Sequence, residues 1–235
     1  GDTLPACTIK LDTQAFSRAG RKIGLGSSAA LTVALTAARA NSIDVLADAL
    51  AAHRKLQGGA GSGIDVAAAV HGGLFEYEMA PRNIQALSWP NGLHMRVLWT
   101  GVPVSTSAKL EQLAEQEEHP SRSALGLAAG RMAIAWRGDD AATILSEYPA
   151  YISVLRQFSV DHELGIFDAG HDELTDAAMA NNLVYKPAGA GGGDIGILFG
   201  RDAAELDAFV AQHADPDQGV VSCELDQDGV RLEPA

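Results

Sequence analysis

The chain has 235 residues, of which 47% are hydrophobic and 20% charged, and this balance excludes a mainly disordered protein. Its net charge of −13 comes from 30 acidic against 17 basic residues. That charge argues against nucleic acid or an anionic membrane as the main partner, because both select clustered Lys and Arg. Cys7 and Cys223 form no CxxC pair, and the sequence shows neither a long apolar run nor a signal pattern. We therefore expect a cytoplasmic protein without a disulfide framework, a zinc site or a membrane span.

The sequence pattern in the first part of the chain predicts one strand and three helices. Residues 7–16 alternate apolar and polar side chains, which is typical of a half-buried strand. Residues 28–40 carry almost no charge and predict a helix that is buried on most sides and closed by Asn41. A second helix is predicted over 43–56, and a short helix of small residues begins at Ile64 and ends at glycines.

The second part predicts strands and a long helical region. Strands are expected over 74–79, 85–89 and 93–101, helices from 107 to about 181, a strand, a glycine loop and a strand over 182–200, a helix over 202–213, and a closing hairpin of 219–225 and 229–234. A change of composition near Pro90 predicts two domains, 1–91 and 92–235.

The first glycine loop, "GLGSSA", predicts a phosphate cradle. Gly24 and Gly26 let the backbone approach a ligand, and Ser27 and Ser28 open a helix whose free N–H groups attract an anion. The simpler alternative is that one of the serines caps a core helix. The absence of a Walker A lysine excludes the usual P-loop NTPase, whereas a Rossmann loop with Asp44 as the ribose acid stays open, although "SRAGRK" separates the loop from the strand.

Two further glycine loops carry polar residues. Ser62 and Asp65 stand at the start of the third helix, where the acid is either an N-cap or first-turn residue or a group that positions an attacking oxygen. Lys186 precedes the run "PAGAGGGD", which has more glycine than a hairpin needs and indicates backbone packed against backbone or a ligand. Lys186 is either a phosphate contact or a solvated residue at a strand end.

Together, in this order, the three loops resemble those of the GHMP kinases over residues 22 to about 200. "GLGSSAA" is similar to the family's ATP-phosphate loop, "GSGIDVAAAVHGG" to the segment with the catalytic aspartate, and "KPAGAGGGDIGI" to the third motif. With Asp194 and "WTGVPVST", the resemblance is strongest to the phosphomevalonate kinase branch.

This resemblance implies an α+β fold of the GHMP kinase type. It implies the remainder of a ribosomal-protein-S5-like, ATP-binding N-terminal domain over 1–91 and a ferredoxin-like C-terminal domain over 92–235. It also implies ATP and Mg²⁺ as cofactors, and transfer of a phosphoryl group to 5-phosphomevalonate in the mevalonate pathway of isoprenoid synthesis. The implied partner is a small phosphate-bearing substrate, and a homodimer is left open.

The resemblance also assigns roles to residues. Asp65 takes the catalytic role and Ser28 the metal-binding one. The expected ATP-binding residues are Gly24, Leu25, Gly26, Ser27, Ser28 and Ala29. The expected substrate-binding residues are Ser62, Gly63, Ser105, Thr106, Lys186, Gly189, Ala190, Gly191 and Asp194.

Three departures from the family pattern shape these expectations. Only 23 residues precede Gly24, so we expect the family's first motif to be absent. Mevalonate kinases carry a metal-binding Glu where this chain reads "HRKLQ" from His53, so magnesium is expected to rely on Ser27 or Ser28 and the nucleotide. Ala188 stands where phosphomevalonate kinases often have Ser. The alternatives are a GHMP kinase for an alcohol, such as mevalonate or homoserine, and a truncated non-catalytic relative that binds nucleotide.

Overall fold

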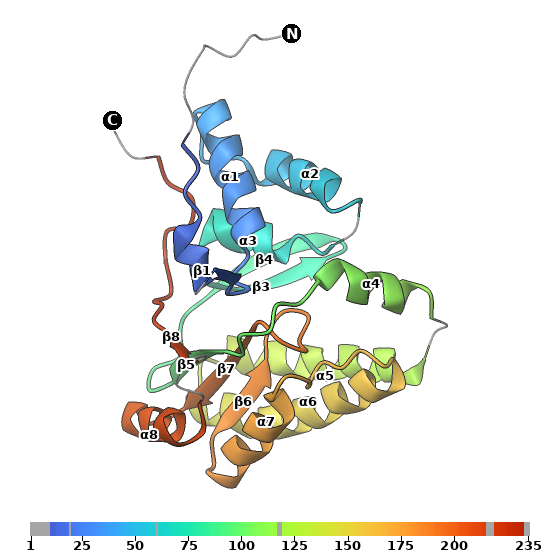
Figure 1. Cartoon of the computed structure of the whole chain (residues 1–235), viewed down its shortest axis with the longest axis vertical. Coiled ribbons are helices and arrows are strands. Elements are labelled where there is room, and N and C mark those ends of the chain that lie inside the picture. The colour runs from blue at the N-terminus through green and yellow to red at the C-terminus, as the bar shows by residue number, and fades with distance from the viewer. Residues whose placement is uncertain (1–9, 19, 60, 117–118, 215–218, 233–235) are drawn as a thin grey trace. The chain divides into compact units, whose positions relative to one another are not determined.

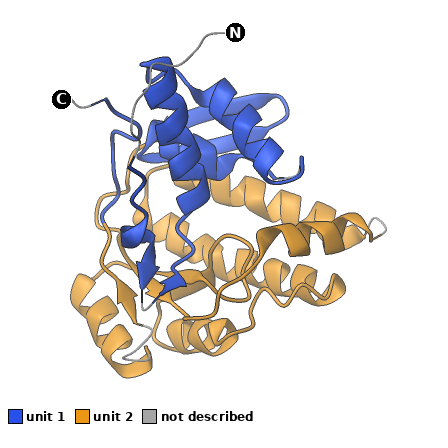
Figure 2. Cartoon of the chain, turned by 45° about the horizontal axis from the view of Figure 1, so that its top comes forward, with its two compact units in different colours: residues 1–86, 224–235 blue, residues 87–223 orange. Residues whose placement is uncertain are grey.

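The computed structural model describes residues 10–18, 20–59, 61–116, 119–214 and 219–232 (Figure 1). The chain divides into two compact units, one of residues 1–86 with 224–235 and one of residues 87–223 (Figure 2). These units differ from the predicted ranges in the placement of residues 87–91 and 224–235. Both contain helices and strands, in agreement with the α+β class. Within the described ranges, no helix has both the length and the apolar character that a membrane crossing requires.

Three helices form the core of the first unit: α1 (Ser27–Ala40), α2 (Leu46–Leu56) and α3 (Ile64–His71). Their apolar residues recur at helical spacing and bury one common face; the buried members are Ala29, Val33, Ala37, Val45, Ala49, Leu50, Val66 and Val70. Asn41 closes α1 in the left-handed conformation, as predicted. The second helix begins three residues later than predicted, because Ser42 Oγ accepts a hydrogen bond from Asp44 N at 3.1 Å and holds a turn there.

The strands of the first unit are short. A 3₁₀ turn (Gln14–Phe16) precedes β1 (Ser17–Arg18), which pairs antiparallel with β2 (Arg21–Lys22). β3 (Leu74–Met79) and β4 (Arg82–Leu87) form a second two-stranded sheet close to the predicted positions.

The predicted strand over 7–16 is wrong for residues 10–16, while residues 7–9 lie outside the described part. Asp12 Oδ1 accepts from Gln14 N at 3.0 Å, and Phe16 N donates to Thr13 O at 3.0 Å. These local bonds use groups that a strand ladder would need, so the alternating pattern yields a turn.

The predicted C-terminal hairpin is also wrong. β8 (Val220–Val221) pairs with β5 in the second unit, whereas the described residues 224–232 belong to the first unit. Gly73 N donates to Asp226 O at 2.5 Å and Val230 N to Val70 O at 3.1 Å. A Cβ on Gly72 would run into the backbone of Gly229, so this packing requires glycine.

The second unit is built on a four-stranded sheet with the order β6-β7-β5-β8. β5 (His94–Trp99) pairs antiparallel with β7 (Ile195–Gly200), which pairs antiparallel with β6 (Val184–Pro187). The prediction of a strand, a glycine loop and a strand is therefore confirmed, because β6 and β7 flank the third glycine loop.

Helices cover both faces of this sheet. They are α5 (Pro120–Arg137) and α6 (Ala141–Asp161) on one face, and α7 (His171–Ala180) and α8 (Ala203–His213) on the other, while α4 (Thr106–Ala114) precedes them in the chain. Phe199 packs in the cluster formed with α5 and α6, which lie side by side (Figure 1). Its neighbour Leu198 packs in the cluster formed with α7 and α8. Successive side chains of β7 thus point to opposite faces of the sheet, as they do in any β-strand.

Candidate active site

The first glycine loop leads from β2 directly into α1. Gly24 and Gly26 have φ values of +93° and +70°, and Gly26, not a serine, is the N-cap residue of α1. Ser27 is the first helical residue, and no side chain caps this end. The interpretation that Ser27 or Ser28 caps the helix is therefore wrong, and the first backbone N–H groups of α1 have no side-chain acceptor in the described structure.

The second glycine loop leads into α3 in the same way. Gly63 is the N-cap residue with φ +77°, and a Cβ there would collide with the Leu50 side chain. Asp65 is therefore not the N-cap; it lies in the first turn, where its Oδ1 accepts from Val66 N at 2.9 Å. The carbonyl oxygen of Ser62 accepts a hydrogen bond from Tyr77 Oη at 2.8 Å, and this bond fixes the loop.

These two helix starts lie against each other. A Cβ built on Gly26 would be 3.8 Å from the Asp65 Cβ. The Asp65 side chain is 36% exposed and Ser28 is exposed, so both are accessible to a ligand. The structure thus brings the predicted phosphate-binding loop and the predicted catalytic aspartate together within the first unit.

His53 lies beside Ser28 and Asp65, although the sequence analysis assigned it no place in the site. Its Nε2 lies 3.2 Å from Ser28 Oγ and 3.9 Å from Asp65 Oδ2, and the side chain is only 3% exposed. The sequence carried one signal: His53 follows Ala49 and Leu50 at the spacing of the buried face of α2. A polar residue on such a face needs a partner, but the sequence does not say which.

The Rossmann alternative is wrong. A dinucleotide-binding loop leads from a strand through a helix into a parallel strand that carries the ribose acid. In the described part of the chain, α1 is followed by α2, and Asp44 lies in the turn between them.

The third glycine loop, in the second unit, packs backbone against backbone, one of the two arrangements expected for it. Gly192 N donates to Ile166 O at 2.7 Å. A Cβ on Gly191 would run into Ile166, and one on Gly193 into Val102 O, whereas one on Gly189 would meet nothing within 4 Å. Close packing thus explains Gly191 and Gly193, and Gly189 stays open for the predicted substrate contact.

Two lysines adjoin this loop. Lys186 on β6 is only partly exposed, its Nζ donates to Pro187 O at 2.6 Å, and burial lowers its pKa to about 8. Lys186 is therefore not a freely solvated strand-end residue. Lys109 on α4, which the sequence analysis missed, donates to Gly191 O at 2.8 Å and to Ala190 O at 3.4 Å. Burial lowers the pKa of Lys109 too.

The remaining predicted substrate residues lie near the start of α4. Ser105 is the N-cap of α4, where its Oγ accepts from Ala108 N at 3.4 Å, and Thr106 is the first helical residue. Asp194 Oδ1 accepts from Val104 N at 3.4 Å, and Asp194 N donates to Val102 O at 2.7 Å. Asp194 and Ser105 thus have structural partners, and their roles toward a substrate stay predictions.

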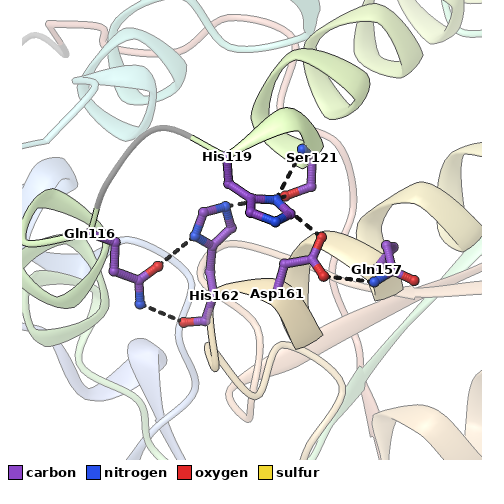
Figure 3. Close-up of polar contacts among 6 residues, drawn as sticks. All are labelled: Gln116, His119, Ser121, Gln157, Asp161 and His162. Atoms are coloured by element: carbon purple, nitrogen blue, oxygen red, sulfur yellow. Dashed lines mark hydrogen bonds and ion pairs between the residues drawn. The ribbon is translucent and has the colours of Figure 1, made fainter.

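A polar cluster elsewhere in the second unit superficially suggests nucleophilic catalysis (Figure 3). His119 Nδ1 lies 2.8 Å from Ser121 Oγ and 3.4 Å from Asp161 Oδ2, and Ser121 Oγ lies 3.3 Å from His162 Nε2. A catalytic triad needs the acid and the serine on opposite ring nitrogens, whereas here they share one. His119 Nδ1 also accepts from Ser121 N, so the cluster caps α5 and fastens it to the end of α6.

Comparison with known proteins finds similarity to the GHMP kinases. Residues 5–73 match the family model described as GHMP kinases N terminal domain. The phosphomevalonate kinase of Streptomyces sp. (strain CL190) is 31% identical over 234 residues, which cover 84% of this chain and 62% of that relative. The chain is thus similar to the GHMP kinases. It spans about three fifths of the length of this curated relative.

Solved structures confirm the GHMP kinase fold. The Lin0012 protein from Listeria innocua matches with a TM-score of 0.78 and 25% identity, over 86% of this chain and 66% of its own. Streptococcus pneumoniae phosphomevalonate kinase, in complex with phosphomevalonate and AMPPNP, matches with a TM-score of 0.72 and 20% identity, over 88% of this chain and 70% of its own.

Proposed function

We propose that this GHMP kinase relative transfers the γ-phosphoryl group of ATP to the phosphate of 5-phosphomevalonate, giving 5-diphosphomevalonate for isoprenoid synthesis. The observation that carries the proposal is the approach of the uncapped start of α1 to Asp65, with 3.8 Å between the Asp65 Cβ and a Cβ built on Gly26. The 31% identity to a phosphomevalonate kinase supports the choice of acceptor. The cytoplasmic location and the homodimer stay predictions.

The start of α1 binds the triphosphate in this proposal. The N–H groups of residues 27–29 and the positive end of the helix dipole offset the negative charge of the phosphates. Gly24, Leu25 and Gly26 bring the backbone close enough for that contact. Because donor and acceptor are both anionic, binding has to offset their repulsion before the reacting oxygens align.

Asp65 orients the transferred group rather than removing a proton. A phosphate monoester is already mostly ionised at neutral pH, so its attacking oxygen needs a base less than an alcohol does. The acceptor's phosphate is assigned to Lys186, Ser105 and Thr106, and the rest of the acceptor to Ser62, Gly63, Gly189, Ala190, Gly191 and Asp194.

The residues present fit a magnesium ion that is shared with a nucleotide. Within the described ranges, no three His, Cys, Asp or Glu side chains gather as a complete metal site. Mg²⁺ commonly keeps several waters and is bound by one or two carboxylates together with substrate phosphates. Ser28 Oγ and the Asp65 carboxylate would supply the protein's share, and the bound ion would neutralise charge on the phosphate oxygens.

The test is an acceptor assay with ATP labelled in the γ position. Phosphomevalonate, mevalonate and homoserine are offered separately, and label is expected on phosphomevalonate. Label on mevalonate or homoserine instead would show that the chain is a kinase with an alcohol as its acceptor. AMPPNP-dependent thermal stabilisation without transfer to any acceptor would identify a non-catalytic relative and reject the proposal.

A further inference from the structure

His53 contacts both residues on which the proposed function depends, from the interior side. Its Nε2 lies 3.2 Å from Ser28 Oγ and 3.9 Å from Asp65 Oδ2. The His53 side chain is 3% exposed, the Asp65 side chain 36%, and Ser28 is exposed. A ligand from solvent therefore reaches Ser28 and Asp65 but not His53, so any effect of His53 on the reaction passes through them.

The position of His53 would otherwise favour an apolar residue. It lies on the buried face of α2, beside the core residues Ala49 and Leu50. Burying an imidazole there costs free energy unless the ring nitrogens find partners. The contact with Ser28 Oγ supplies one.

The charge of Asp65 determines which way this contact is polarised. A carboxylate 3.9 Å from Nε2 favours a hydrogen on that nitrogen. Nε2–H then donates to Ser28 Oγ, which occupies one acceptor position of the hydroxyl and turns its own O–H away from His53. The hydroxyl is left to donate to a phosphate oxygen at the start of α1.

We propose that His53 is a positioning residue that fixes the Ser28 hydroxyl and the Asp65 carboxylate for phosphoryl transfer. This inference rests on the proposed function and adds a residue to it. His53 touches neither the nucleotide nor the acceptor, and its action is the orientation of the two groups that do.

Three variants of the full chain test this. His53→Leu removes the ring nitrogen at similar volume, His53→Gln can return an amide to the place of Nε2, and Ser28→Ala removes the partner. We expect His53→Leu to lower kcat roughly 10–100-fold, as loss of a group behind a first-contact residue commonly does. His53→Gln should restore most of the loss. Combining Ser28→Ala with His53→Leu should cost less than the product of the two single losses, because both changes remove the same Ser28–His53 contact.

Binding of AMPPNP with Mg²⁺, measured by calorimetry, gives a readout independent of turnover. His53→Leu is expected to weaken this binding. His71→Gln and His71→Leu, at an exposed histidine of α3 in the same unit, are matched controls and should change neither readout.

The outcomes separate this inference from the proposed function. If the wild-type chain binds AMPPNP and transfers phosphate while His53→Leu matches it, only the role of His53 is overturned. Additive losses from Ser28→Ala and His53→Leu, or a His53→Gln variant as poor as His53→Leu, would also overturn it. Failure of the wild-type chain to bind AMPPNP would reject the proposed function, and this inference with it.

Discussion

Gly26 and Asp65 lie next to each other: a Cβ built on Gly26 would be 3.8 Å from the Asp65 Cβ. Such a methyl group would be in ordinary van der Waals contact and would not clash. The restriction at Gly26 comes instead from its φ of +70°, a conformation that costs a non-glycine residue about 1–2 kcal/mol. The bend that starts α1 beside Asp65 therefore depends on this glycine.

Gly26→Ala should lower both stability and nucleotide affinity, because strain at the N-cap disturbs the first N–H groups of α1. Gly58→Ala is the matched control: Gly58 has φ +67° and nothing within 4 Å of an added Cβ. Urea unfolding should show similar losses in the two variants, whereas calorimetry with AMPPNP should show weaker binding only in Gly26→Ala. Equal affinities in the two variants would argue against phosphate binding at this loop.

Asp65→Asn should lower kcat much more than ATP affinity. Asparagine keeps an oxygen that can accept from Val66 N, as Oδ1 does now at 2.9 Å, but it loses the charge. A loss in kcat of about a hundredfold or more is expected when a charged group that orients the transferred group is removed. Asp44→Asn, at an exposed acid of the same unit, serves as the control in steady-state kinetics, and unchanged turnover in Asp65→Asn would reject the catalytic role.

Lys186 should make stability depend on pH above neutrality. Burial lowers its pKa from 10.5 to about 8, so between these values the unfolded chain binds a proton that the folded chain has released. The free energy of unfolding contributed by this group therefore rises as pH increases from about 8 to about 10.5. Lys186→Met should remove that rise and stabilise the fold at neutral pH; urea titrations across this range test it, with exposed Lys55→Met as control. A rise that persists unchanged in Lys186→Met would contradict the assignment.

His162 should make the second unit sensitive to acid. Its pKa is lowered from 6.5, first by burial and then by Arg122 and His119, with Asp161 opposing. Since the unfolded imidazole binds its proton at higher pH than the folded one, the free energy of unfolding falls as pH drops through 6.5 and below. His162→Gln should flatten this dependence at a cost of about 1 kcal/mol for a lost hydrogen bond. Parallel curves for variant and wild type over about pH 5 to 8 would refute the assignment.

Elements with strong local signals were predictable from the sequence. The helix that ends at Asn41 and the short helix before Gly72 have apolar spacing and glycine or asparagine punctuation, and both appear as expected. The strand over 7–16 and the C-terminal hairpin had only weak alternation. A local turn bond at Asp12 replaces the first, and the packing of Gly229 on Gly72 replaces the second, because tertiary contacts and local bonds outweigh a weak strand preference.

The site was predictable where a loop carries its own signature. Gly26 and Asp65 each stand in a recognisable glycine loop, whereas His53 meets Ser28 across 25 residues of sequence. Lys109 likewise reaches Gly191 from a distant helix. Such contacts depend on how helices pack, and a single sequence does not contain that information in local form.

The most direct test is a crystal structure of the chain with AMPPNP and Mg²⁺. The account predicts triphosphate oxygens at roughly 2.7–3.2 Å from the backbone nitrogens of residues 27–29, the ordinary hydrogen-bond distance. A triphosphate bound elsewhere, with no phosphate oxygen at the start of α1, would contradict this account.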